Sequence, residues 1–200
     1  MSQTELVREI AAAAARIVVE EGLEYGPAKQ RAIKTLGLPS RSALPDNDLL
    51  EDEVREYLAL FCADTQPGEL AALRRLAAQW MERLAEFRPH LSGAVWRGTA
   101  TRLSNIHLQL FCDDSKAAEI ALLNAGVDYD VGQMRGPRGE MVDVLSVAAP
   151  CRELGESITI AMTILDHDDL RGALKPDSRG RSERGDLNAL RKLLKESPQA

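Results

Sequence analysis

The chain has 200 residues and a mass of 21.9 kDa, the size of one ordinary domain or of a small domain with a helical extension. Hydrophobic residues make up 44% of it, which is enough for a buried core and excludes a chain that is disordered throughout. Its 25 basic and 31 acidic residues give a net charge of −6. This charge argues against a whole surface devoted to nucleic acid, although it does not exclude a local basic patch.

Cysteine spacing and hydropathy indicate the compartment. The three cysteines (Cys62, Cys112 and Cys151) lie far apart without Cys-x-x-Cys spacing, so neither a disulfide framework nor a zinc site is expected. The longest apolar run, Ile10 to Ala15, is too short to cross a bilayer. The chain does not open with a basic segment followed by an apolar one, so no secretion signal is predicted. We therefore expect a cytoplasmic protein without membrane partners.

Helical patterns fill the first 89 residues. In the longest of them, apolar residues recur every three or four positions, as they do in a helix with one buried face. Glycine after a segment and proline in its first turn are typical helix boundaries. The predicted helices cover residues 4–21, 27–36, 49–61 and 67–87.

Beyond residue 89 the pattern changes to short strands. Residues 104–111 alternate polar and apolar side chains, which is typical of a strand with one buried face. Further strands are predicted at 93–98, 127–131, 141–147 and 157–165, with helices at 115–124 and 186–194. The sequence thus predicts an α+β fold with a small mixed sheet. We expect a helical region at 1–89, an α+β core at 90–170, and a Gly/Arg-rich linker with a final helix at 171–200.

One stretch of this predicted core carries a recognisable motif. Gly98-Thr99 precedes Ser104-Asn-Ile-His-Leu108, which resembles the nucleotidyltransferase superfamily related to DNA polymerase β. That family has a Gly-Ser or Gly-Thr turn followed by Ser-Asp-Ile-Asp-Leu on a strand. The resemblance implies a turn that opens a short helix and binds nucleotide phosphate through Gly98, Thr99 and Ser104.

The resemblance also implies a metal site and a reaction. Side chains at i and i+2 of a strand face the same side, so Asn105 and His107 would take the metal-ligand positions. Asp143, in a Val-Asp-Val sequence, would supply the third carboxylate that the family takes from a neighbouring strand. With Mg²⁺ or another divalent metal, the three residues would catalyse transfer of a nucleoside monophosphate from ATP or another NTP to an unknown acceptor.

The motif departs from the family at its central positions. Amide and imidazole groups replace the paired acids, and both are poor ligands for Mg²⁺, which prefers carboxylate oxygens. The segment between Gly98 and Asn105 is also shorter than is usual in the family. An alternative is therefore a catalytically inactive module of the same fold that binds a nucleotide or a protein partner. A plainer alternative is an amphipathic strand whose Asn105, His107 and Gln109 face water.

Two charged segments follow the last predicted strand. Asp166 and Asp168 are additional candidate metal ligands, although the sequence Asp-His-Asp-Asp at 166–169 also suits a helix N-cap. Five basic residues at 171–184, interrupted by glycine, proline and serine, could contact phosphates or RNA. The same run is equally typical of a solvated linker.

The first two predicted helices open like those of TetR-type repressors. In that family a recognition helix follows the glycine that here is Gly37. Pro39 and Pro45 come directly afterwards and leave no room for a helix that could enter a DNA groove. The sequence therefore argues against specific DNA binding.

Overall fold

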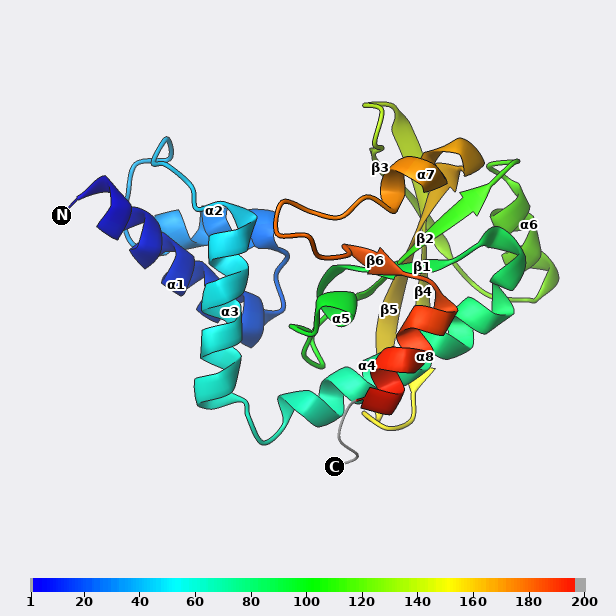
Figure 1. The fold of residues 1–200 in the computed structure, drawn as a ribbon, viewed down its shortest axis with the longest axis horizontal. Coiled ribbons are helices and arrows are strands. Elements are labelled where there is room, and N and C mark those ends of the chain that lie inside the picture. Colours follow the sequence, from blue (N-terminus) through cyan, green and yellow to red (C-terminus); the bar gives the residue numbers. More distant parts are fainter. Residues whose placement is uncertain (1, 197–200) are drawn as a thin grey trace. The chain divides into compact units, whose positions relative to one another are not determined.

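The computed structural model describes residues 2–196 and separates the chain into two units, Met1–Pro67 and Gly68–Ala200 (Figure 1). We refer to them as the N-terminal and C-terminal units. The expected α+β class is confirmed, because helices accompany one mixed six-stranded sheet. The boundary between the units differs from the expected residue 89. Helix α4 (Gln66–Arg83) contributes its apolar residues to the core of the sheet and thus belongs largely to the C-terminal unit.

Three helices form the N-terminal unit: α1 (Gln3–Glu21), α2 (Tyr25–Thr35) and α3 (Asn47–Phe61). Helix α1 begins one residue earlier than expected, because Ser2 and Glu5 form a capping box at its start. The two later helices both pack on α1. Their buried apolar residues form a core of their own, which includes Ile10, Ile33 and Leu50. No helix forms at 36–46, where the two prolines lie.

The C-terminal unit contains all six strands. They are β1 (His90–Ser92), β2 (Ile106–Cys112), β3 (Asp130–Arg135), β4 (Met141–Cys151), β5 (Glu156–Asp166) and β6 (Arg184–Gly185). Besides α4, its helical segments are η1 (Ala85–Phe87), α5 (Gly93–Arg97), α6 (Ala117–Asn124), η2 (His167–Asp169), α7 (Leu170–Ala173) and α8 (Leu187–Glu196). None of the helices within residues 2–196 combines the length and apolar content that a bilayer crossing requires.

The strand order in the sheet is β3-β4-β5-β2-β1-β6. Strand β2 pairs in parallel with β5 and antiparallel with β1, so it occupies the middle of the sheet. One face of the sheet is apolar, with Ile106, Leu108 and Ile160 fully buried. Residues of α4, α6 and α8 join the same hydrophobic cluster, so these helices cover this face, called here the core face (Figure 1).

The segment 93–98, expected to be a strand, is the helix α5. Gly93 adopts φ +72°, a conformation that glycine takes without strain, and this turn ends β1 and starts the helix. The buried Arg74 then donates to the carbonyl oxygens of Val95 and Trp96 at the helix end, with N···O distances of 3.0 Å in both bonds. Burial lowers the pKa of Arg74. The carbonyls at the end of α5 are thus satisfied from α4, a partner that no local pattern reveals.

The segment 171–196 is more than the expected linker. Strand β6 pairs with β1, and Leu190 of α8 is fully buried in the core of the sheet. Trp96 packs directly on Gly185, where an added Cβ would come within 2.2 Å of the indole ring. The indole Nε1 also donates to the Ser182 carbonyl oxygen at 2.8 Å. These contacts hold the end of the described chain to the edge of the sheet.

Candidate functional site

Strand β2 has the alternation that its sequence predicts. Ile106, Leu108 and Leu110 are fully buried on the core face. His107 and Gln109 therefore point to the opposite side of the sheet, where both are partly accessible. Asn105 precedes the strand and is exposed.

A row of small and polar side chains crosses the sheet beside His107. In the strand register, His107 lies opposite Ser92 of β1 on one side and opposite Ala161 of β5 on the other. Ser92 in turn lies opposite Arg184, and Ala161 lies opposite Ser146. Directly paired residues point to the same side of a sheet, so these five side chains share one face. We call it the His107 face.

Asp143 is not part of this face. It lies on β4 three residues before Ser146, and successive residues alternate between the two faces of a strand, so Asp143 points to the core face. There its carboxylate accepts hydrogen bonds from Gln133 Nε2 at 3.2 Å and Lys116 Nζ at 3.1 Å. These two hydrogen bonds lower the pKa of Asp143. The expected grouping of Asp143 with Asn105 and His107 is therefore not formed.

The carboxylates at the end of β5 and just after it are also remote from His107. Asp166 pairs with Cys112, five residues further along β2, which corresponds to about 16 Å at the usual rise of a strand. Its Oδ1 accepts the Asp168 N–H at 2.8 Å and caps η2, as the N-cap interpretation of this segment predicts. Asp168 itself is exposed.

The predicted phosphate-binding turn at Gly98 and Thr99 lies at the end of a helix, whereas the motif predicts it at the start of one. Gly98, with φ +89°, follows the end of α5 as its C-cap rather than opening a helix. Thr99 is only 3% exposed, and its hydroxyl oxygen is buried without a hydrogen-bonding partner. The Ser104 hydroxyl oxygen accepts the Thr101 N–H at 3.0 Å. Burial therefore keeps Thr99 from direct contact with a ligand in this conformation.

The glycine beside His107 is Gly93, for which the sequence predicts no role in a site. A Cβ at this position would approach His107 Cδ2 to 3.2 Å, so the imidazole ring lies directly against the turn between β1 and α5. For Arg184 the sequence predicts only a basic residue in a segment that could be a linker or contact phosphates. Its place beside Ser92 depends on the pairing of β6 with β1, and neither the two-residue strand nor its partner has a sequence signal.

Two polar atoms near this row are buried without partners. Gln109 Oε1 and Arg184 Nε are inaccessible and make no hydrogen bond. By register, Gln109 lies on the same face two residues after His107, and Arg184 ends the row at β6. Burial also lowers the pKa of Arg184. Unsatisfied buried polar atoms are rare in proteins and are often found where a ligand or water binds.

The donors around His107 do not suit Mg²⁺. The neighbours of His107 in the row are a serine and an alanine, and Asp143 lies on the opposite face of the sheet. Amide and imidazole groups without a carboxylate leave a hard cation without its preferred ligands. Within residues 2–196, no three His, Cys, Asp or Glu side chains are grouped so that they could hold a metal ion.

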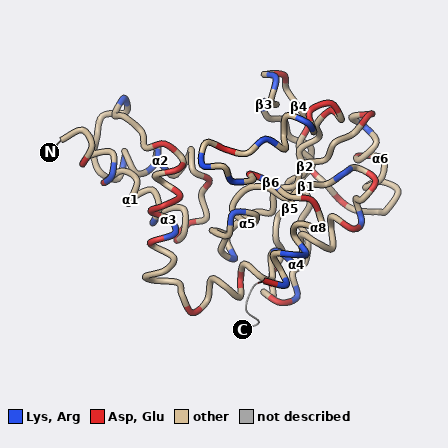
Figure 2. Tube along the Cα trace, viewed as in Figure 1, with Lys and Arg blue, Asp and Glu red and all other residues tan. Residues whose placement is uncertain are grey.

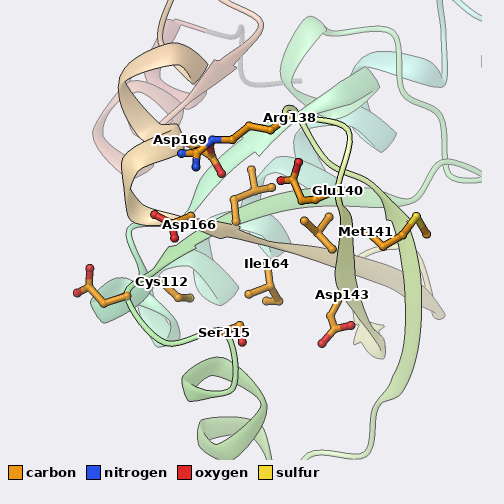
Figure 3. Close-up of a pocket in the computed structure, with 12 residues that line it drawn as sticks. Cys112, Ser115, Arg138, Glu140, Met141, Asp143, Ile164, Asp166 and Asp169 are labelled. Carbon is orange, nitrogen blue, oxygen red and sulfur yellow. The ribbon is translucent and has the colours of Figure 1, made fainter.

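A pocket of about 550 Å³ opens at the carboxyl ends of β2 and β5 (Figure 3). It brings together Asp143 and Asp166, two of the predicted ligands, but neither Asn105 nor His107. In Figure 3, Arg138 and Asp169 meet on one side of the pocket and Asp143 and Ser115 lie on the other, with Ile164 between them. Acidic stretches of chain at 113–114 and 166–169, seen in red in Figure 2, flank this end of the sheet.

Comparison with known proteins gives no relative. No protein-family model matches the chain, and neither the curated proteins nor the solved structures contain a match.

Proposed function

We propose that the C-terminal unit is a nucleotidyltransferase-like module that binds a phosphate-bearing ligand, above all a nucleotide, and does not catalyse nucleotidyl transfer. The observation that carries this proposal is the composition of the His107 face. Its row offers a guanidinium, two hydroxyls and an imidazole, and its nearest carboxylate, Asp130 on the edge strand β3, lies three strands from His107.

The donors in this row suit an anion. Arginine is the residue best adapted to phosphate because its guanidinium donates several hydrogen bonds in one plane. Arg184 Nε lacks a protein partner, while other nitrogens of the same group are held by Ala173 O and Glu183. The guanidinium is therefore fixed in place, and its Nε–H is a donor that no protein atom uses. Because this nitrogen is inaccessible, a phosphate reaches it only when the side chains that cover it move. Ser92 and His107 lie next in the row and could extend the same contact.

Support for the absence of catalysis comes from the positions of the acids. Nucleotidyl transfer in the family that the motif resembles needs carboxylates to hold the metal that bridges the triphosphate. Here Asp143 is on the core face and is held by Lys116 and Gln133, and Asp166 lies at the far end of β5. Binding by the His107 face would accordingly be independent of a divalent cation.

Calorimetric titration of the full chain with ATP, GTP, CTP and UTP tests the proposal, each in EDTA and in Mg²⁺. We expect at least one nucleotide to bind with the same affinity in both buffers and no release of pyrophosphate. Arg184→Gln should weaken binding about tenfold or more, because a hydrogen bond to a charged group is lost. Arg171→Gln is the matched control, since Arg171 is an exposed arginine of the same segment outside the row.

Circular dichroism of Arg184→Gln shows whether the variant remains folded, and Ser92→Asp gives a second test. The added carboxylate lies beside Arg184 and should repel a phosphate without removing any packing group. No binding of any of the four nucleotides at millimolar concentration would refute a nucleotide ligand. Pyrophosphate release that requires Mg²⁺ would instead establish the transferase activity.

A further inference from the structure

The pocket at the carboxyl ends of β2 and β5 is separate from the His107 face and has a different chemistry. Its lining includes the apolar residues Val142, Ile164 and Leu165 together with the buried Cys112. Burial raises the pKa of Cys112 to about 11, so its thiol is uncharged at neutral pH. Five carboxylates also line the pocket, those of Asp113, Glu140, Asp143, Asp166 and Asp169.

Only two of these carboxylates are neutralised by ion pairs. Lys116 binds Asp143 at 3.1 Å, and Arg138 binds Asp169 at 2.8 Å. Within residues 2–196 no cation forms an ion pair with Asp113, Glu140 or Asp166. The pocket therefore keeps a net negative charge next to an apolar surface, and such a site attracts cations.

The pocket already accepts one organic cation from its own chain. The side chain of Asp169 is only 6% exposed, whereas that of its partner Arg138 is 59% exposed. Arg138 belongs to the turn between β3 and β4, and its guanidinium reaches from there to the buried carboxylate (Figure 3). A guanidinium on a flexible stem thus occupies one end of the pocket, which identifies the kind of group that the buried carboxylate binds.

The spacing of the other carboxylates argues against a compact metal ion. No three acidic, histidine or cysteine side chains among the described residues are close enough together to ligate a metal. Carboxylates that are separated from one another in a partly apolar pocket instead complement positive charges separated by an aliphatic chain. The volume of about 550 Å³ is within the range usual for small-molecule sites.

We propose that this pocket binds an aliphatic polyamine. Its methylene segments lie on Val142, Ile164 and Leu165, and its ammonium groups lie against the unpaired carboxylates of Asp113, Glu140 and Asp166. Arg138 acts as a tethered competitor, because its guanidinium holds the buried carboxylate of Asp169. This inference does not depend on nucleotide binding, since the pocket contains no residue of the His107 row.

Titration calorimetry of the full chain with spermidine at low salt tests the proposal, with Mg²⁺ as the inorganic comparison. We expect saturable binding of spermidine that millimolar Mg²⁺ does not abolish. The double variant Asp113→Asn, Asp166→Asn should lose about tenfold in affinity, because two of the unpaired charges disappear. Asparagine is also a good N-cap, so the cap on η2 is retained. Arg138→Gln should bind spermidine several-fold more tightly, because the competitor is removed.

Asp128→Asn is the matched control, since Asp128 is an exposed carboxylate outside the pocket. It changes the net charge without changing the proposed site, so its affinity for spermidine should equal that of the wild type. Equal losses in Asp128→Asn and in the double variant would show nonspecific attraction by a chain of net charge −6 and overturn the proposal. Displacement of spermidine by Mg²⁺ would also overturn it, as would tighter binding of a trilysine peptide, which would indicate a basic protein partner.

Discussion

Ile106 and Asn105 are consecutive residues with opposite environments. Ile106 has no exposed surface and is part of the main hydrophobic cluster, whereas Asn105 is exposed. A carboxylate at position 106 would be buried without a partner, which costs several kcal/mol. We expect Ile106→Asp to unfold the C-terminal unit, measured as loss of the thermal transition seen by tryptophan fluorescence.

Asn105→Asp is the control for this change, because it places the same carboxylate one residue away in water. Its melting temperature should remain within a few degrees of the wild type, since exposed substitutions change stability by about 0.5 kcal/mol or less. A cooperative transition at the wild-type temperature in Ile106→Asp would contradict the assignment of β2 to the core.

At the scale of single elements, β2 and α5 differ in how well their sequences predict them. In β2 every second residue is apolar, and this period alone predicts a strand and its buried face. In α5, the four residues between Gly93 and Gly98 fit either a strand or a helical turn. The conformation of Gly93, with φ +72°, and the hydrogen bonds from Arg74 stabilise the helix instead of a strand. Arg74 lies about twenty residues earlier in the chain. Local patterns cannot supply such information.

In the candidate site, too, local patterns predict the face of a strand but not its neighbours. The common face of His107 and Gln109 could be predicted from the period of one strand. The neighbours of His107 could not, because they depend on which strands pair and in which register. The sequence pattern therefore predicts that Asp143 lies on a strand, but it does not predict whether Asp143 and His107 share a face. A shift of one residue in the strand register moves a side chain to the other side of the sheet.

Strand β6 is attached to the sheet through a close contact at Gly185. A Cβ there would come within 2.2 Å of Trp96, a distance that no packed carbon atoms tolerate. We expect Gly185→Ala to separate β6 from β1 and to weaken the packing of α8. Hydrogen exchange of the amides at 184–190 should then become faster. Gly172→Ala is the control, because nothing lies within 4 Å of its added Cβ. Equal exchange rates of the amides at 184–190 in the two variants would contradict a role of the Gly185–Trp96 contact in holding β6.

At the scale of the whole molecule, the two units have separate hydrophobic cores. Leu50 belongs to the N-terminal core and Leu108 to the other, and both are fully buried. The chain has two tryptophans, Trp80 and Trp96, and both belong to the C-terminal unit. Tryptophan fluorescence therefore follows the unfolding of that unit alone, while far-ultraviolet circular dichroism follows both.

Truncation of either leucine to alanine should destabilise its own unit by about 2–5 kcal/mol, because a cavity replaces the side chain. For domains of this size such a loss lowers the melting temperature by about 10 °C or more. We expect Leu108→Ala to lower the fluorescence midpoint by that amount. Leu50→Ala should leave this midpoint unchanged and shift only the part of the circular dichroism transition that comes from the N-terminal unit. If Leu50→Ala lowers the fluorescence midpoint as much as Leu108→Ala does, the two units unfold as one cooperative body, and the separation of their cores does not extend to their stability.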